Sequence, residues 1–154
     1  MLRDFCVTTL RVHVVGDFYD EEYTNKWLQV VRANRRVRFY AYTRSWVVPE
    51  LEPLLRELGQ EKNFRLWYSY DVTMPVPPRV RGIRRCYLSG NDEDMPAAKK
   101  ADLIFRDDQS TVLKRGPDGT LCCPYDNGVT ETTCSKCQLC WLKKARIPKG
   151  VASA

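Results

Sequence analysis

The segment Leu10-Arg-Val-His-Val-Val-Gly16 sets the fold class, because it begins a series of alternating strands and helices. It is short, rich in β-branched residues and stopped by a glycine, which predicts a buried strand. Strand-like runs recur at Val37–Tyr42 and Phe64–Ser69, each after a stretch of helical periodicity. Strands and helices that alternate at these intervals need right-handed crossovers between parallel strands. The sequence therefore predicts an α/β protein with a mainly parallel sheet.

The two intervening helices carry signals at their boundaries. Asp20 is the predicted cap of the first helix. Its apolar face is predicted at Tyr23, Trp27, Val30 and Val31. The second helix has Pro49 in its first turn, and Gly59 is predicted to supply a left-handed stop. Its apolar stripe is expected at Leu51, Leu54, Leu55 and Leu58.

The chain changes character after the third strand. Prolines at 75, 77 and 78 predict an extended loop, followed by short strands at Val80–Leu88 and Ala101–Arg106. We expect a body at residues 1–115, a cysteine-rich segment at 116–146 packed on it, and a flexible tail at 147–154.

Five of the seven cysteines lie within 19 positions near the C-terminus. A Cys-Pro pair ends at Pro124, and three cysteines spaced two residues apart follow it. This spacing predicts a sulfur-ligated centre, since short turns aim successive thiolates at one point. The predicted ligands are Cys123, Cys134, Cys137 and Cys140.

Three interpretations of these cysteines stay open. The triplet with a remote Cys-Pro favours a 4Fe–4S cluster, although in ferredoxins the Cys-Pro usually follows the triplet. Zinc is the alternative, since Cys-x-x-Cys turns are also zinc ligands. Free or disulfide-bonded cysteines are the third interpretation. Cys122 lies beside a predicted ligand and could replace Cys123, whereas Cys6 and Cys86 are expected to be ordinary buried thiols.

Charge and hydropathy predict the cellular location of the protein and the kind of partner that it binds. We expect a cytosolic protein, because no apolar run resembles a signal peptide or a membrane helix of about 20 residues. The net charge of +6 favours acidic partners such as nucleic acid or an acidic protein surface. Clustered arginines suggest a basic contact surface at Arg35, Arg36, Arg84 and Arg85, with solvated turns as the simpler interpretation.

Polar side chains follow the predicted parallel strands, where functional groups gather in α/β proteins. The candidates for a residual site are His13, Asp17, Tyr42 and Arg44. A structural role competes for two of them, because a lone histidine is often part of the core and Asp17 could cap a helix.

Four blocks of the sequence resemble the phage "gene product eighty-eight" domain family. They are Arg11–Phe18, Phe39–Trp46, Leu66–Ser69 and the final cysteine segment, and they appear in the family's order from about Leu10 to Trp141. Members occur on phages, plasmids and other mobile elements. The family is similar to radical S-adenosylmethionine proteins, which implies a truncated, partial (β/α) barrel. Gly16-Asp17 would then match the turn that touches the amino group of S-adenosylmethionine.

The resemblance also implies what this chain lacks. Longer members carry an upstream cysteine segment, the candidate site of a radical cluster, whereas here Cys6 alone precedes the first strand. The terminal cysteines would correspond to an auxiliary cluster. Without the earlier strands, Leu10–Gly16 would have an unpaired edge, which a protein partner or a second copy of the chain could cover.

Together these features predict a non-catalytic phage or plasmid accessory protein with an iron–sulfur or zinc centre held by four cysteines. We expect it to bind and inhibit a host or competitor nucleoprotein complex, for example as an anti-CRISPR protein or a transfer inhibitor. Two alternatives stay open: a degenerate S-adenosylmethionine-binding or redox enzyme, and a nucleic-acid-binding protein. No membrane contact is expected.

Overall fold

The computed structural model describes residues 7–107, 113–126 and 132–142. The chain divides into two compact units: Met1–Tyr68 with Pro78–Arg84, and Ser69–Pro77 with Arg85–Ala154. This division differs from the predicted one at residue 115. The predicted tail at 147–154 lies outside the described residues.

The elements alternate as the sequence predicts. Strands β1 (Thr9–Val12), β2 (Arg38–Thr43) and β3 (Phe64–Tyr70) are connected by helices α1 (Glu21–Ala33) and α2 (Glu52–Gln60). β1 pairs with β2, and β2 with β3, in parallel. Strands β4 (Arg84–Ser89) and β5 (Leu103–Arg106) are also a parallel pair. The order β1-β2-β3-β4-β5 is the sequential order of a (β/α) barrel, which confirms the predicted α/β class and the partial-barrel topology.

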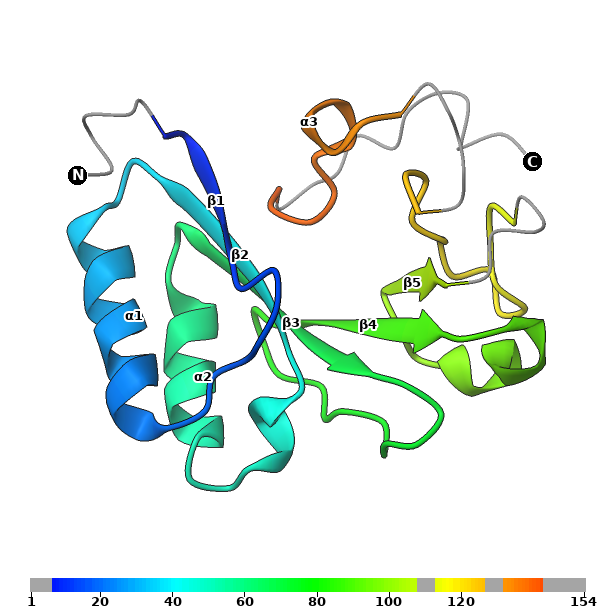
Figure 1. Cartoon of the computed structure of the whole chain (residues 1–154), viewed down its shortest axis with the longest axis horizontal. Helices are drawn as coiled ribbons and strands as arrows, with labels where there is room; N and C mark the ends of the chain where they lie inside the picture. Colours follow the sequence, from blue (N-terminus) through cyan, green and yellow to red (C-terminus); the bar gives the residue numbers. More distant parts are fainter. Residues whose placement is uncertain (1–6, 108–112, 127–131, 143–154) are drawn as a thin grey trace. The chain divides into compact units, whose positions relative to one another are not determined.

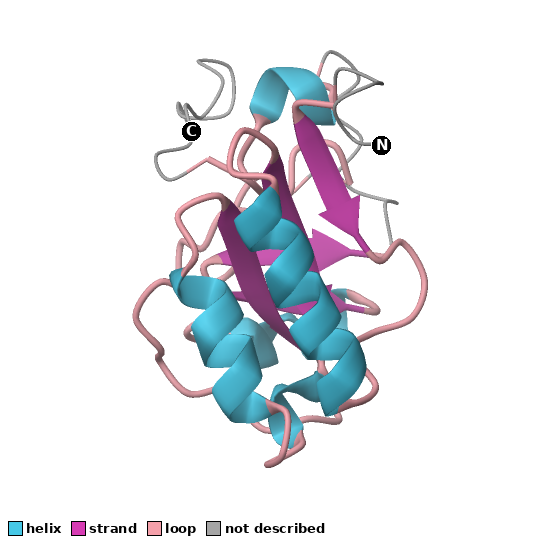
Figure 2. Ribbon diagram, turned by 90° about the vertical axis from the view of Figure 1, so that its left-hand side faces the viewer, coloured by secondary structure: helices cyan, strands magenta, loops and turns pink. Residues whose placement is uncertain are grey.

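The helices cover one face of the first three strands. Figures 1 and 2 show α1 and α2 side by side on that face. Strand alternation turns Phe39, Ala41 and Thr43 of β2 toward the helices, and all three are buried, whereas Tyr40 and Tyr42 are half-buried on the other face. The core side chains against these helices are Leu28, Val31, Leu55, Leu58, Phe64 and Leu66.

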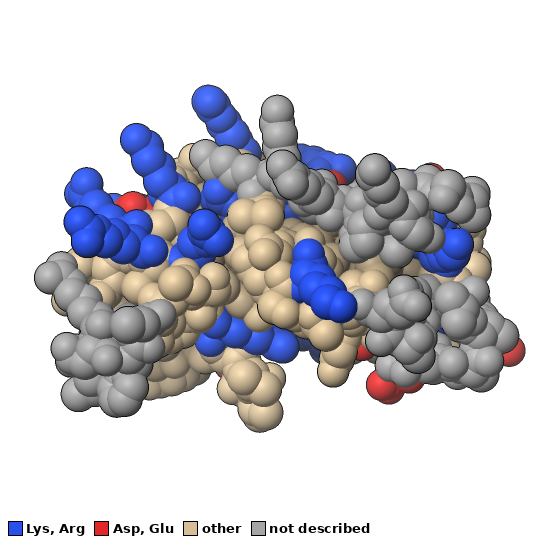
Figure 3. Space-filling view, turned by 90° about the horizontal axis from the view of Figure 1, so that it is seen from above, with Lys and Arg blue, Asp and Glu red and all other residues tan. Residues whose placement is uncertain are grey.

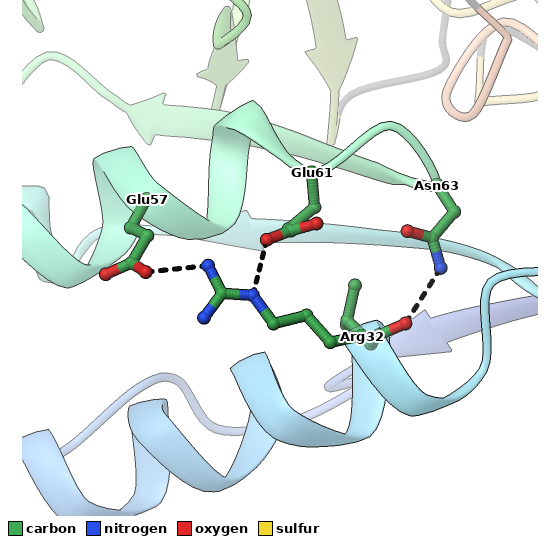
Figure 4. A network of polar contacts seen from close by, with 5 residues as sticks. Arg32, Glu57, Glu61 and Asn63 are labelled. Carbon is green, nitrogen blue, oxygen red and sulfur yellow. Dashed lines mark hydrogen bonds and ion pairs between the residues drawn. The ribbon is translucent and has the colours of Figure 1, made fainter.

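A polar network ties the two helices together at their solvent side (Figure 4). The Arg32 guanidinium donates to Glu57 and Glu61, with both nitrogen–oxygen distances at 2.7 Å. Asn63 donates its side-chain amide to the backbone oxygens of Val31, Asn34 and Val37 at 3.0–3.2 Å. Two of these carbonyls, those of Val31 and Asn34, lie at the end of α1, where the last carbonyls lack a donor from the next helical turn.

Local boundaries confirm some predictions and correct others. Asp20 caps α1 by accepting a hydrogen bond from the Tyr23 N–H. The first strand ends at Val12 rather than Gly16, because His13 has φ +63°. Val14 and Val15, predicted to be buried, are 78% and 91% exposed.

The second helix also differs from the prediction. It begins after Leu51, with Pro53 in its first turn, so Pro49 precedes it. Gly59 lies inside the helix and is not its left-handed stop. A Cβ there would come within 2.5 Å of Ile83 Cγ1, so close packing explains the glycine.

Short elements make up most of the second unit. It contains β4, β5, the 3-10 helix η2 (Asp92–Ala98) and the single-turn helix α3 (Cys134–Cys137). Ile104 of β5 forms an isolated parallel bridge with Cys122, and the Cys123 N–H donates to the Ile104 carbonyl at 2.7 Å. Within the described ranges, none of the helices is long and apolar enough to cross a membrane.

Candidate functional site

The four predicted ligand cysteines line one small cavity of the second unit. Its lining consists of Cys123, Tyr125, Cys134, Cys137, Gln138, Leu139, Cys140 and Trp141. Cys123 and Cys137 are buried, Cys140 is half-buried and Cys134 is exposed. The structure therefore brings together the residues that the spacing singled out.

The Cys-Pro turn presents Cys123 to this cavity. The bond from the Cys123 N–H to β5 fixes the backbone, and Pro124 then begins a turn. The backbone N–H groups of Asp126 and Tyr125 donate toward the Cys123 sulfur. The Asp126 carboxylate accepts from the Arg106 N–H at 2.7 Å, which holds the turn against β5. Backbone donors around a sulfur are typical of metal-bound cysteines.

Helix α3 and the turn after it present the other three cysteines. Thr133 caps the helix through its hydroxyl, and Gln138 ends it with φ +57°. The left-handed residue reverses the chain, so that Cys137 and Cys140 flank a tight turn. Within that turn the backbone N–H of Leu139 donates toward the Cys137 sulfur.

Burial controls the protonation of these thiols. It raises the pKa of Cys123 to about 12, against the opposing effect of its backbone donors. Burial also raises the pKa of Cys137, again opposed by a backbone donor. Both side chains are therefore thiols at neutral pH when no metal is bound. Because a metal binds the thiolate, binding must release these protons.

The donor set fits a sulfur-ligated metal in the kind of its ligands. Four cysteines from two turns face one cavity, and two of them receive backbone N–H groups. Among the described residues, however, no group of three or more Cys, His, Asp or Glu has the arrangement of a metal site. The metal and its type therefore stay predictions.

The remaining cysteines lie elsewhere. Cys122 is buried beside Cys123 but is not among the cavity's lining residues, since it pairs with Ile104. Cys86 is buried in β4, as predicted. Cys6 lies outside the described residues.

Asp17 connects the strand-end loops of the first unit. One carboxylate oxygen accepts from the Phe18 N–H at 2.7 Å and from the Thr43 hydroxyl at 2.5 Å, and the other accepts from the Arg44 N–H at 2.7 Å. Asp17 is therefore not a helix cap. It fixes the loop after β1 to the end of β2.

His13 belongs to an aromatic cluster at the start of the same loop. Its Nε2 lies 2.7 Å from the Tyr23 hydroxyl, and its ring packs against Phe18 and Trp27 at centroid distances of 4.8 and 6.2 Å. Desolvation lowers the imidazole pKa, and the nearby Asp17 partly offsets that effect. These contacts indicate a structural histidine.

Tyr42 and Arg44 take different positions at the end of β2. Tyr42 lies on the opposite face of the strand from Thr43, where its ring contacts Trp67. Arg44 has an exposed side chain, and its backbone N–H donates to Asp17. The structure therefore brings His13, Asp17 and the Arg44 backbone to one strand-end loop, whereas the Tyr42 ring belongs to another face of the sheet.

The predicted basic surface separates into two kinds of residue. Arg35 and Arg36 are exposed in the turn before β2, and Arg84 is half-buried. Arg85 is only 4% exposed and donates to the Pro77 carbonyl at 3.2 Å, so the prediction that it belongs to the contact surface is corrected. Consecutive strand residues point to opposite faces, which places Arg84 and Arg85 apart.

The sequence analysis missed a second set of residues on the first three strands. Arg11, Tyr40 and Arg65 alternate with the buried core positions on β1, β2 and β3, and Trp67, two residues after Arg65, is buried on the same face. Their signal in the sequence is the recurrence of arginine and aromatic residues at a period of two, which indicates a second polar face on the predicted strands.

The comparisons with known proteins identify a family. No curated protein and no solved structure gave a significant match. The family model described as "Gene product 88" matches residues 2–143, which is most of the chain. The match includes both the strand-end residues and the four cavity cysteines. The chain therefore belongs to the Gene product 88 family.

Proposed function

We propose that the chain is a non-catalytic accessory protein of a phage or plasmid, stabilised by a metal centre with four cysteine ligands. It binds and inhibits a nucleoprotein complex of the host or of a competitor in the host cytosol, for example as an anti-CRISPR protein or a transfer inhibitor. The observation that carries the proposal is the single cavity lined by Cys123, Cys134, Cys137 and Cys140.

The contacts around the cavity support a structural centre. Cys123 lies on a turn anchored to β5, and the other three cysteines come from α3 and the turn that follows. A 4Fe–4S cluster or a zinc ion bound to all four cysteines would join these two turns. A centre with four cysteine ligands keeps no open position for a substrate.

The strand-end residues support a binding role in preference to catalysis. Asp17 occupies the position that resembles the S-adenosylmethionine-binding turn, yet its two oxygens already accept three hydrogen bonds from the chain. Three of the roughly four acceptor sites of this carboxylate are therefore already used, which leaves little capacity for an amino group. Gly16, with φ +90° and no atom within 4 Å of an added Cβ, lies at an open loop.

Anaerobic purification with iron, sulfide and zinc analysis tests the metal centre. About four iron and four sulfide per chain would identify the cluster, and one zinc would identify the alternative. Cys123→Ser is expected to lose the metal. The matched control is Cys122→Ser, which changes the neighbouring buried cysteine outside the cavity and is expected to retain it. Wild-type protein without iron or zinc would contradict the proposal.

A capture experiment from lysate of the bacterial host tests the inhibitory role. The full chain is expected to recover a stoichiometric nucleoprotein complex and to reduce its activity when added back. The inhibition must be specific to the captured complex. An unrelated nuclease from the same lysate, whose activity the chain should not reduce, serves as the control. S-adenosylmethionine binding near micromolar by calorimetry would instead favour the degenerate-enzyme alternative.

A further inference from the structure

The face of the β1–β3 sheet opposite the helices carries arginine and aromatic side chains in alternation. Parallel register places Arg11 beside Tyr40 and Tyr40 beside Arg65 across the three strands. Because residues two apart share a face, Arg38 and Tyr42 belong to the same surface. We define the arginine–aromatic face by its six members, which are Arg11, Arg38, Tyr40, Tyr42, Arg65 and Arg84.

Charge and aromatic rings are in direct contact on this face. The Arg11 guanidinium lies 5.2 Å from the centre of the Tyr42 ring, and the Arg84 guanidinium lies 5.1 Å from the centre of Trp67. Tyr40 and Tyr42 meet edge to face at 6.1 Å. Such cation–π contacts hold the guanidinium planes against the rings. The arrangement places fixed cations beside the half-buried rings of Tyr40 and Tyr42, whereas Trp67 is itself only 1% exposed.

The cations on the helices have a different environment. Lys26, Arg32 and Arg56 each pair with a glutamate of the same unit, and Arg32 pairs with two (Figure 4). In contrast, no carboxylate among residues 7–107, 113–126 and 132–142 pairs with Arg11, Arg38 or Arg65. In the left half of Figure 3, blue lysine and arginine side chains cover more of the surface than red acidic side chains do.

Arg65 is the member whose charge is least compensated. It is half-buried, and its Nη1 donates to the Phe64 carbonyl at 2.6 Å. Its Nε is buried and has no hydrogen-bond partner in the described structure. Desolvation lowers the Arg65 pKa, and the positive charge of Arg84 lowers it further. An anion that reached the two guanidinium groups would relieve both effects.

We propose that the arginine–aromatic face binds single-stranded nucleic acid. The guanidinium groups of Arg11, Arg38, Arg65 and Arg84 contact phosphates, and unpaired bases stack on Tyr40 and Tyr42. A basic surface with aromatic rings is how sequence-tolerant binders hold a single strand, because every base has a face that can stack. A duplex shields its base faces, so it can use only the arginines. The inference deepens the proposed function, since it assigns the part of a nucleoprotein complex that this chain would contact.

Fluorescence anisotropy with a labelled oligothymidylate of about 20 nucleotides tests the inference on the full chain as purified. The expected dissociation constant is at least about tenfold lower for the single strand than for a duplex of the same length. Affinity should fall as salt rises, with a log–log slope of about −0.7 for each phosphate contacted.

Three variants separate stacking from charge. Arg11→Gln with Arg38→Gln is expected to weaken binding about tenfold and to reduce the salt slope. Tyr42→Leu is expected to weaken binding about tenfold with the slope unchanged, since it removes a stacking surface. Arg32→Gln is the matched control, because Arg32 on α1 is already paired with glutamates. Its dissociation constant should stay within about twofold of that of the wild type.

Several results would overturn the inference. These are no binding at about 50 mM salt, equal affinity for duplex and single strand, or a loss in Arg32→Gln as large as in the double variant. The assay contains no protein partner. A failure here with successful capture of a complex would therefore reject the nucleic-acid surface alone, whereas binding without capture would reject the inhibitory role alone.

Discussion

The contacts that stabilise the first compact unit differ in kind from those that stabilise the second. The first unit has two helices of 13 and 9 residues over a parallel sheet, with Phe39, Leu55, Leu58 and Phe64 fully buried. The second unit has the parallel pair β4–β5, the four-residue helix α3 and isolated bridges, and its buried positions include Leu103 and Ile104 as well as Cys122, Cys123 and Cys137. A thiol buries less apolar area than a large aliphatic or aromatic side chain. The comparison indicates that apolar packing specifies the first unit, whereas the proposed metal centre would cross-link the cysteine turns of the second unit.

Removal of the proposed metal should have the largest effect, and it should affect the second unit much more than the first. Structural zinc contributes about 10–16 kcal/mol of binding free energy in small domains. Cys137→Ser is expected to lose the metal and the hydrogen-exchange protection of the Cys123, Gln138 and Trp141 amides, which donate to backbone oxygens near the cavity. The amides of α1 and α2 should stay protected. Hydrogen exchange followed by mass spectrometry measures both regions in one sample.

The control for this experiment is Cys86→Ala, which removes a buried thiol in β4 outside the cavity. It should keep the metal and the protection near α3. Equal loss of protection in α1, α2 and α3 after Cys137→Ser would contradict the difference between the units.

A truncation in the first core should have the next largest effect. Leu55 is fully buried on α2, so Leu55→Ala is expected to lower the free energy of unfolding by about 2–5 kcal/mol. Leu54→Ala, at a half-buried position on the same helix, should cost clearly less. Urea unfolding of the first unit, followed through α-helical circular dichroism, measures the difference, and metal content should not change. Loss of metal in Leu55→Ala would show that the units do not fold independently.

The sequence predicted the first unit better than the second for a physical reason. Helical and strand periods are local, so the alternation from Thr9 to Tyr70 could be read directly, as could the Asp20 cap. The His13 conformation could not, because positive φ is rare outside glycine and asparagine. Likewise, Gly59 resembled a helix stop. The glycine is instead explained by the close packing of Ile83, which is distant in the sequence.

For the candidate site, spacing predicted the cysteine positions but not their surroundings. A Cys-x-x-Cys pattern identifies side chains that a short turn can bring together, and the cavity contains all four. Cys122 forms a β-bridge with Ile104 of β5, and no local sequence pattern encodes this contact. The burial of Arg85 beside Pro77 has the same origin in tertiary contacts.

Two glycine substitutions compare how tightly the two units are packed, with smaller expected effects on stability. An added Cβ would lie 2.5 Å from Ile83 Cγ1 at Gly59, and 2.6 Å from Ile104 Cδ1 at Gly116. Overpacking typically costs about 1–3 kcal/mol. We expect Gly59→Ala to cost more than Gly116→Ala, since a Cδ1 at the end of a side chain can move more easily than a Cγ1. Thermal unfolding of metal-loaded protein measures both, and the reverse order would show that the second unit is packed more tightly.

The smallest expected effect is a pH dependence of the first unit. Because burial lowers the His13 pKa below its ordinary value of about 6.5, the folded state favours the neutral imidazole. Its contribution to stability is present above about pH 6.5 and is lost as the pH falls toward the folded pKa, since the unfolded state then binds the extra proton. Denaturant midpoints between about pH 7.5 and 5 should therefore fall. His13→Asn, whose side chain does not titrate and tolerates the left-handed conformation, should show a smaller decrease. An unchanged slope in that variant would assign the pH dependence to carboxylates instead.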